Sequence, residues 1–244
     1  MKKFLFLLSA LSSPAMADEA ATKQDFVDAN VISIFYHEFG HAAIDLLQLP
    51  IYGQEEDAAD NFSTFLIDAL FDNQAATAVA SDAAQGFWLE ALTGNMDYEQ
   101  VAWWDVHGPS LQRYYNHVCL FYGADPDARK EFANNAELPE ERAEGCPMEY
   151  DSANFAWGTV LDDLAEAGKY DGKLVLRSDG SEEAQFIVTV LEPEIQILNE
   201  NFSVPRELVV KVESCDEANA FYDSEDKSIT FCTEFVPHLF ELAN

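Results

Sequence analysis

Residues 25–49 read DFVDANVISIFYHEFGHAAIDLLQL, and this stretch decides the fold of the chain. On a helical projection its apolar side chains lie on nearly every side, and they are Phe26, Val27, Val31, Ile32, Ile34, Phe35, Ile44, Leu46 and Leu47. A helix that is apolar all round is covered by other parts of its protein. The stretch therefore predicts a long, buried central helix, which is stopped by Pro50.

The same stretch contains His37-Glu38-Phe39-Gly40-His41, an HExxH motif. Because four residues make just over one helical turn, both imidazoles project from one face and can share a metal ion. Glu38 lies beside the pair, where it can act as a base toward a water molecule at the metal. Two neutral histidines and a carboxylate are costly to bury without a partner, so the position of the motif on a buried helix favours a metal site.

A third ligand is expected from the next helix, predicted over about residues 55–71, whose first turns contain Glu55, Glu56, Asp57 and Asp60. At about 100° per residue, Glu56 and Asp60 lie on the flank of the apolar stripe, Asp57 points away, and Glu55 stays open. Since Glu56 and Asp60 are four residues apart, one can bind the metal while the other orients a ligand histidine. Acids also favour helix N-termini without any metal, and this is the simpler explanation for Glu55 and Asp57.

The rest of the chain divides into a helical part and a strand-rich part. Further helices are predicted over residues 75–104, 109–122 and about 155–167, with an acidic, turn-rich excursion over 125–151. After Gly172, short β-branched segments predict strands at residues 173–177, 185–190, 207–212 and 228–231. Helices within 18–170 and strands within 171–235 indicate an α+β fold, and 18–244 has the length of a single domain.

The first residues are typical of a secretory signal peptide. Lys2 and Lys3 precede the apolar run Phe4–Leu11, and Ala15-Met16-Ala17 is a small-x-small cleavage site, so the predicted leader is 1–17. The expected location is therefore the periplasm or the outside of the cell. No segment has eighteen consecutive apolar residues, so stable membrane insertion is not expected.

Export changes the interpretation of the four cysteines. Cys119, Cys146, Cys215 and Cys232 contain no CxxC pair, which argues against a zinc ribbon. In an oxidising compartment they are expected to form two disulfides. Three pairings are possible, and Cys119–Cys146 with Cys215–Cys232 is favoured because each closes a local loop.

The composition excludes some partners. With 45 Asp+Glu against 13 Lys+Arg, the formal net charge is −32, and removal of the leader with its two lysines makes it −34. Such a chain repels nucleic-acid backbones and favours cationic partners.

The metal motif and its surroundings resemble known proteins. His37-Glu38-x-x-His41 followed by Glu56-x-x-x-Asp60 resembles the gluzincin branch of zinc metallopeptidases, in which a downstream glutamate completes the ligand set. The strings 37–44 and 49–60 look more closely like an uncharacterised bacterial group whose description as metallopeptidases rests on the zinc motif. Later segments support this closer match, namely Asp105-x-His107, Gln112-Arg113-x-Tyr115-Asn116, Cys119-x-x-Tyr122-Gly123, Asn219–Asp223 and Ile229-x-x-Cys232.

The resemblance implies a zincin-like fold in which His37, His41 and Glu56 bind Zn²⁺ and Glu38 is the general base. Asp60 would then orient one ligand histidine. Three protein ligands leave one coordination position for water, as a catalytic zinc requires.

A hydrolase of this kind also needs a donor for the tetrahedral oxyanion. The sequence offers His107, Arg113, Tyr114 and Tyr222. Each has a simpler explanation: His107 as a loop residue, Arg113 as half of an ion pair, and the tyrosines as packing residues. Among these, His107 and Arg113 join Glu38 as the candidate catalytic residues.

Four other residues have simpler roles. His117 and His238 lack supporting neighbours and are expected to be structural or on the surface. Trp103 and Trp104 could line a peptide groove, although packing in a satellite core is the commoner role.

Together these features predict an exported zinc-dependent peptidase acting on peptides or proteins. One alternative is a zincin-like scaffold without activity that serves as a binding module, which the intact Glu38 argues against. Another is a zinc amidase acting on cell-wall material, and substrate profiling would distinguish it.

Overall fold

The computed structural model describes residues 14–93 and 101–244, with side chains from Thr22 onward. The predicted leader, 1–17, lies outside the described residues except for residues 14–17, which begin the first helix. The helices are α1 (Pro14–Leu47), α2 (Glu55–Leu70), α3 (Asn73–Thr93), α4 (Ser110–Ala124), α5 (Lys130–Asn135), α6 (Glu140–Ala143), α7 (Cys146–Ala165), α8 (Glu182–Asn201) and α9 (Phe235–Leu242). The strands are β1 (Leu174–Ser178), β2 (Leu208–Glu213), β3 (Ala220–Asp223) and β4 (Ser228–Cys232).

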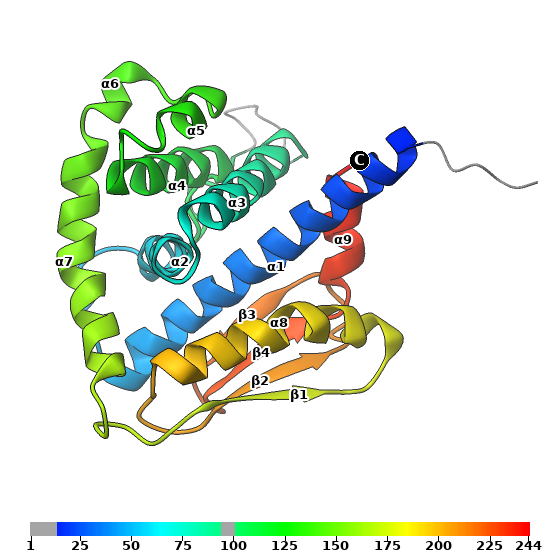
Figure 1. Cartoon of the computed structure of the whole chain (residues 1–244). Coiled ribbons are helices and arrows are strands. Elements are labelled where there is room, and N and C mark those ends of the chain that lie inside the picture. Colours follow the sequence, from blue (N-terminus) through cyan, green and yellow to red (C-terminus); the bar gives the residue numbers. More distant parts are fainter. Residues whose placement is uncertain (1–13, 94–100) are drawn as a thin grey trace, which may run out of the picture.

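Helix α1 passes through the middle of the molecule, as its all-round apolarity predicts. Helices α2 to α7 lie on one side of it, and the sheet with α8 lies on the other (Figure 1). Val27, Phe35 and Phe39 on α1 have no exposed surface. Because α1 contacts both layers, the buried polar residues His37 and Glu38 of this helix lie between them.

The sheet has the strand order β1-β2-β4-β3. β1, β2 and β4 are parallel, whereas β3 runs antiparallel to β4 and forms an edge of the sheet. β3 also contacts α1, so this edge strand lies beside the helix that carries the HExxH motif. The helical majority with a small mixed sheet is an α+β fold, as predicted.

The strand predicted at residues 185–190 is wrong, because these residues lie inside α8. Ser181 caps this helix by accepting a hydrogen bond from the main-chain N–H of Ala184. Its buried residues follow a helical period, and they are Ala184, Ile187, Leu191, Glu194, Ile195 and Leu198. Parallel β1 and β2 need a crossover connection, and α8 provides it, so tertiary structure overrides the β-propensity of the segment.

Other parts of the chain also differ from the prediction. Helix α3 ends at Thr93 rather than extending toward residue 104, and β3 is a strand that the sequence pattern did not reveal. The excursion over 125–151 contains the short helices α5 and α6 and the start of α7. Trp103 and Trp104 do not form a satellite core, because their exposed fractions are 58% and 85%.

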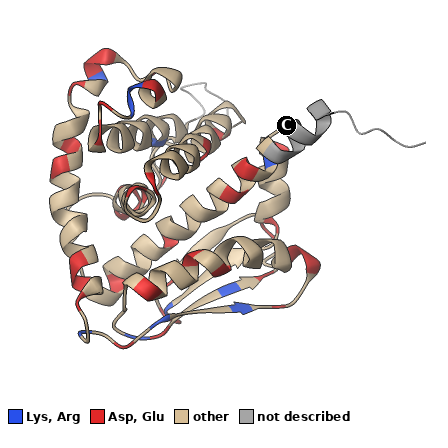
Figure 2. Cartoon of the chain, in the orientation of Figure 1, with Lys and Arg blue, Asp and Glu red and all other residues tan. Residues whose placement is uncertain are grey.

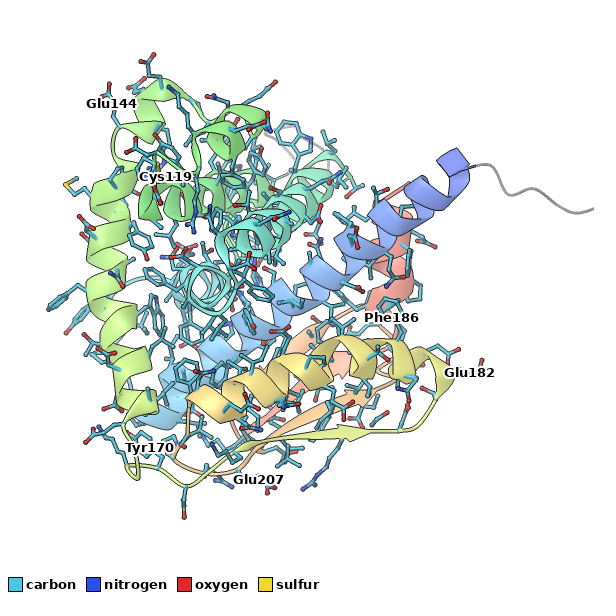
Figure 3. All side chains as sticks on the ribbon, viewed as in Figure 1. Cys119, Glu144, Tyr170, Glu182, Phe186 and Glu207 are labelled. Atoms are coloured by element: carbon cyan, nitrogen blue, oxygen red, sulfur yellow. A yellow bond between two sulfur atoms is a disulfide. The ribbon has the colours of Figure 1, made fainter. Side chains whose placement is uncertain are left out.

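The disulfides pair as expected. Cys119 on α4, which is labelled in Figure 3, is bonded to Cys146 at the start of α7. Cys215 is bonded to Cys232 at the end of β4. The first bond ties the residues 125–145 to the helical layer, and the second ties the segment after β2 to the sheet.

Acidic side chains are spread over the helices of both layers, whereas Lys and Arg are few (Figure 2). Among the described helices, none is long and apolar enough to cross a membrane.

Candidate metal centre

The HExxH turn of α1 lies directly against the start of α2, and Gly40 makes this possible. A Cβ atom at position 40 would lie 3.1 Å from the Cα of Ala59 and 3.1 Å from the ring of Phe62. A side chain there would push α2 away, since helix packing is close enough that one added carbon is felt. Glycine inside the motif therefore brings the acidic N-terminus of α2 to the two histidines.

Three side-chain atoms converge at this crossing. The Nε2 atoms of His37 and His41 are 3.1 Å apart, and each lies 3.2 Å from Oε2 of Glu56. Within the described part of the chain, these three residues are the group of His, Cys, Asp and Glu side chains placed to hold a metal ion.

The other ring nitrogen of each histidine is held by a carboxylate. Nδ1 of His37 lies 2.7 Å from Oδ1 of Asp60, and Nδ1 of His41 lies 2.8 Å from Oε1 of Glu55. Because ionised carboxylates only accept hydrogen bonds, both Nδ1 atoms carry the hydrogen. In neutral rings the two Nε2 lone pairs then face each other and the Glu56 oxygen.

Such an arrangement requires a positive charge at its centre, and the donors suit zinc. Two imidazole nitrogens and one carboxylate oxygen form a common ligand set of catalytic zinc sites, with carboxylates orienting the histidines from behind. Spacings of 3.1–3.2 Å between donor atoms fit a tetrahedral ion with bonds of about 2.0–2.1 Å.

The pKa values of the donor residues also indicate that the site favours a positive charge. Burial lowers the pKa of His37, but hydrogen bonds to Asp60 and Glu56 outweigh it and raise the value to about 9. The pKa of His41 is also raised, since the bonds to Glu56 and Glu55 outweigh its burial. The histidines around Glu56 hold its pKa far below the usual range against the effect of burial. A metal ion at this point competes with protons for the same negative surroundings.

Arg113 lies behind the histidines and does not reach into the cluster. Its Nε and Nη2 atoms donate to the two oxygens of Asp60 at 2.7 Å each, in a bidentate pair. The guanidinium also stacks 4.5 Å from the ring centre of Phe87. Because Arg113 fixes Asp60, and Asp60 fixes His37, the arginine acts on the metal centre through a chain of hydrogen bonds.

Glu38 is buried beside the cluster, with only 6% of its surface exposed. Burial raises its pKa, although both neighbouring histidines and a hydrogen bond from the main-chain N–H of Tyr222 oppose the rise. The last contact comes from β3, so the sheet edge as well as α1 orients this carboxylate.

His107 approaches the centre from the loop before α4. Its Nε2 lies 3.0 Å from Oε2 of Glu56, and its Nδ1 lies 3.4 Å from Oδ1 of Asp105. The ring remains 46% exposed, which makes it the most accessible histidine around the centre. The hydrogen bond to Glu56 raises the pKa of His107, so the ring favours its charged, donating form.

The remaining candidates lie elsewhere. Tyr114 donates to the carbonyl of Ala136 at 2.8 Å and is buried between helices, as a packing residue would be. His117 is buried and bonded to Thr64 and Ala80, and His238 is on the surface of α9, 3.8 Å from Glu90.

A cleft of about 640 Å³ opens over the cluster. Its walls come from α1, the start of α2, the His107 loop and β3, and include Glu38, His41, Glu56, His107 and Tyr222. The hydroxyl of Tyr222 donates to Asp45 at 2.6 Å, so the hydroxyl is engaged at the wall of the cleft.

Sequence reasoning did not find two of these positions. For Glu55 the sequence favours the role of a helix N-terminal acid and leaves a ligand role open, whereas its carboxylate lies on Nδ1 of His41. Asp45 follows His41 by four residues on α1, and this i, i+4 spacing on the motif face was the available signal.

Comparison with known proteins gives one family. A family model matches residues 8–161 and 179–243, which include α1, α2 and the strands β3 and β4. Neither a curated protein nor a solved structure gives a significant match. Because the matched segments span most of its length, the chain belongs to the DUF4344 family, whose description is "Putative metallopeptidase".

Proposed function

We propose that this protein is an exported zinc-dependent peptidase in which His37, His41 and Glu56 hold the metal and Glu38 is the general base. The observation that carries the proposal is the convergence of three donor atoms whose histidines are each fixed by a carboxylate. Hydrolysis requires a carboxylate that lies beside such a centre and is open to a cleft. A structural zinc site does not require one.

When bound, zinc supplies Lewis acidity, which polarises the scissile carbonyl and acidifies water. Glu38 takes the proton from the attacking water at its carboxylate and delivers it to the nitrogen of the leaving amine. Burial favours this role, since it raises the pKa of Glu38 and makes the carboxylate a better proton acceptor.

His107 is the best-placed donor for the oxyanion of the tetrahedral intermediate. Its ring reaches Glu56 from the open side of the cleft, and its raised pKa favours a ring with hydrogen on both nitrogens. Arg113 is assigned a different task, because both of its hydrogen bonds hold Asp60. It positions His37 rather than touching substrate.

Strand β3 supports an extended peptide as the substrate. Its outer edge has no strand partner among the described residues, and Ala220 and Tyr222 line the cleft. Residues two apart on a strand present their main chain to the same edge, so Ala220 and Tyr222 share one edge of β3. The main chain of Tyr222 faces Glu38 from that edge. An extended peptide could therefore pair with β3 and pass its scissile bond over the metal. The strongly negative surface favours cationic peptides.

The decisive experiment combines metal content with hydrolysis of an unbiased peptide mixture. The purified protein is expected to hold one zinc per chain and to cleave peptides, and a chelator is expected to remove both properties. Glu38→Gln should keep the zinc but lower hydrolysis by several orders of magnitude, while Glu141→Gln, an exposed change on α6, should behave as the parent. Absence of stoichiometric zinc, or full activity in Glu38→Gln, would falsify the proposal.

Export is supported by the two disulfides, which persist in oxidising compartments. Mass spectrometry of protein recovered from the native host is expected to find an N-terminus at Asp18. An intact N-terminus with reduced cysteines would contradict this part of the proposal.

A further inference from the structure

A second, smaller cavity adjoins the cleft. It has a volume of about 180 Å³ and shares His37, Glu38, His107 and Ala220 with the walls of the cleft. This volume corresponds to about six water molecules in the liquid, which suits one long side chain. A peptide crossing the metal centre could therefore place one side chain in this cavity.

Most of the cavity wall is apolar and comes from three helices. Ile34 of α1, Phe87 of α3, and Phe235 and Leu239 of α9 line it. These surfaces can cover the methylene stem of a side chain, which lysine and arginine bury readily while the charged head finds a polar partner.

The charged side chains on the cavity wall differ in the partners that hold them. Arg113 is the one Lys or Arg among the described lining residues, and Asp60 neutralises it through the bidentate pair. His37, Glu38 and His107 also line the cavity and belong to the centre described above, so Glu90 is the charged group of the wall that lies outside that centre. The nearest recorded partner of the Glu90 carboxylate is Nε2 of His238 at 3.8 Å, beyond hydrogen-bond distance, so among the described residues this carboxylate has no hydrogen bond.

We propose that this cavity, called here the Glu90 pocket, accepts a lysine or arginine side chain of the peptide substrate, and that Glu90 determines this specificity. An acidic side chain would meet the Glu38 and Glu90 carboxylates there. The Glu90 side chain is 39% exposed, and a purely apolar occupant would cover the part that faces the cavity without giving the carboxylate a partner. The proposal rests on the peptidase function proposed above and adds the class of residue that the enzyme selects.

The test uses the zinc-loaded protein and pairs of peptides that differ only in lysine or norleucine at one position, scanned along the peptide. Norleucine keeps the stem and removes the charge. The parent is expected to show a kcat/KM about tenfold or more higher for lysine at one position. Glu90→Gln should remove this preference by lowering kcat/KM for the lysine peptide alone, with zinc content unchanged. Glu131→Gln, an exposed change on α5, is the matched control and should keep the preference.

A lysine preference that survives in Glu90→Gln, or that is absent from the parent, overturns the assignment of the pocket while leaving the peptidase function intact. If the parent cleaves no peptide, the proposed function fails, and binding of the same peptides by calorimetry then decides the pocket. In that case the assignment of the pocket is supported if the lysine peptide binds more tightly than the norleucine peptide and Glu90→Gln removes the difference. Equal binding of the two peptides overturns the assignment.

Discussion

Tyr222 on β3 donates its hydroxyl hydrogen to Asp45 on α1 at 2.6 Å, and this bond ties the edge strand to the helix that carries the metal motif. Lys227, in the turn after β3, also pairs with Asp45. The main chain of Tyr222 also faces Glu38, seven residues before Asp45 on the same helix, and opposes the rise in the pKa of that carboxylate. One residue therefore meets α1 at two points, and its hydroxyl holds β3 against the helix that carries Glu38.

Tyr222→Phe is expected to lower kcat about three- to tenfold, because small errors in the position of a catalytic group slow the reaction. The zinc content should not change, since Tyr222 contacts none of the three ligands. Steady-state kinetics and metal analysis of the same preparation measure both quantities. Tyr52→Phe is the control, because Tyr52 is 97% exposed. An unchanged kcat in Tyr222→Phe would mean that the hydroxyl does not position Glu38.

Glu55→Gln is expected to weaken zinc binding about 10- to 100-fold, because loss of a carboxylate behind a ligand histidine reduces its basicity and its orientation. The fold should survive, since the Glu55 side chain is 49% exposed. Competition with a chelating dye measures the affinity, and thermal unfolding of the metal-free protein checks the fold. Equal affinity in parent and variant would show that Glu55 is only a helix N-terminal acid, and Glu141→Gln supplies the baseline.

Gly40→Val is expected to destabilise the protein by about 1–3 kcal/mol, as overpacking of a close contact does. It should also weaken zinc binding, because α2, which carries Ala59 as well as Glu56, has to move away from α1. Gly53→Val is the matched control, since no atom lies within 4 Å of a Cβ there. Urea unfolding gives the stability of both variants. Similar losses in the two would contradict the role of the close contact at Gly40.

Much of this structure can be predicted from local pattern. The long apolar run gave α1, the acidic amphipathic segment gave α2, and the β-branched runs gave β1, β2 and β4. The pattern fails where partners far along the chain decide the outcome. Residues 185–190 have strand propensity but form the crossover helix between parallel strands, and β3 has four residues whose pairing with β4 defines it.

The candidate site divides in the same way. His37, His41, Glu56 and Asp60 follow from helical spacing, and the structure brings them together. Glu55 is the first residue of α2, so the direction of its side chain depends on how the chain enters the helix. Helical spacing alone therefore cannot predict the direction of the Glu55 side chain. The i, i+4 spacing from His41 places Asp45 on the motif face, but no local pattern identifies its partner Tyr222, which is 177 residues away.

His117 gives a pH dependence of stability that does not involve the metal ligands. Burial lowers its pKa to about 4, although a hydrogen bond to the carbonyl of Ala80 opposes the shift. Since the unfolded ring titrates near 6.5, the stabilisation is complete above that pH and is lost as the pH falls toward 4, by up to about 3 kcal/mol. We expect the ring protons of His117 in NMR spectra, assigned with His117→Asn, to stay unshifted between pH 8 and about 5. A midpoint for His117 near 6.5 would show that the buried ring accepts a proton without cost.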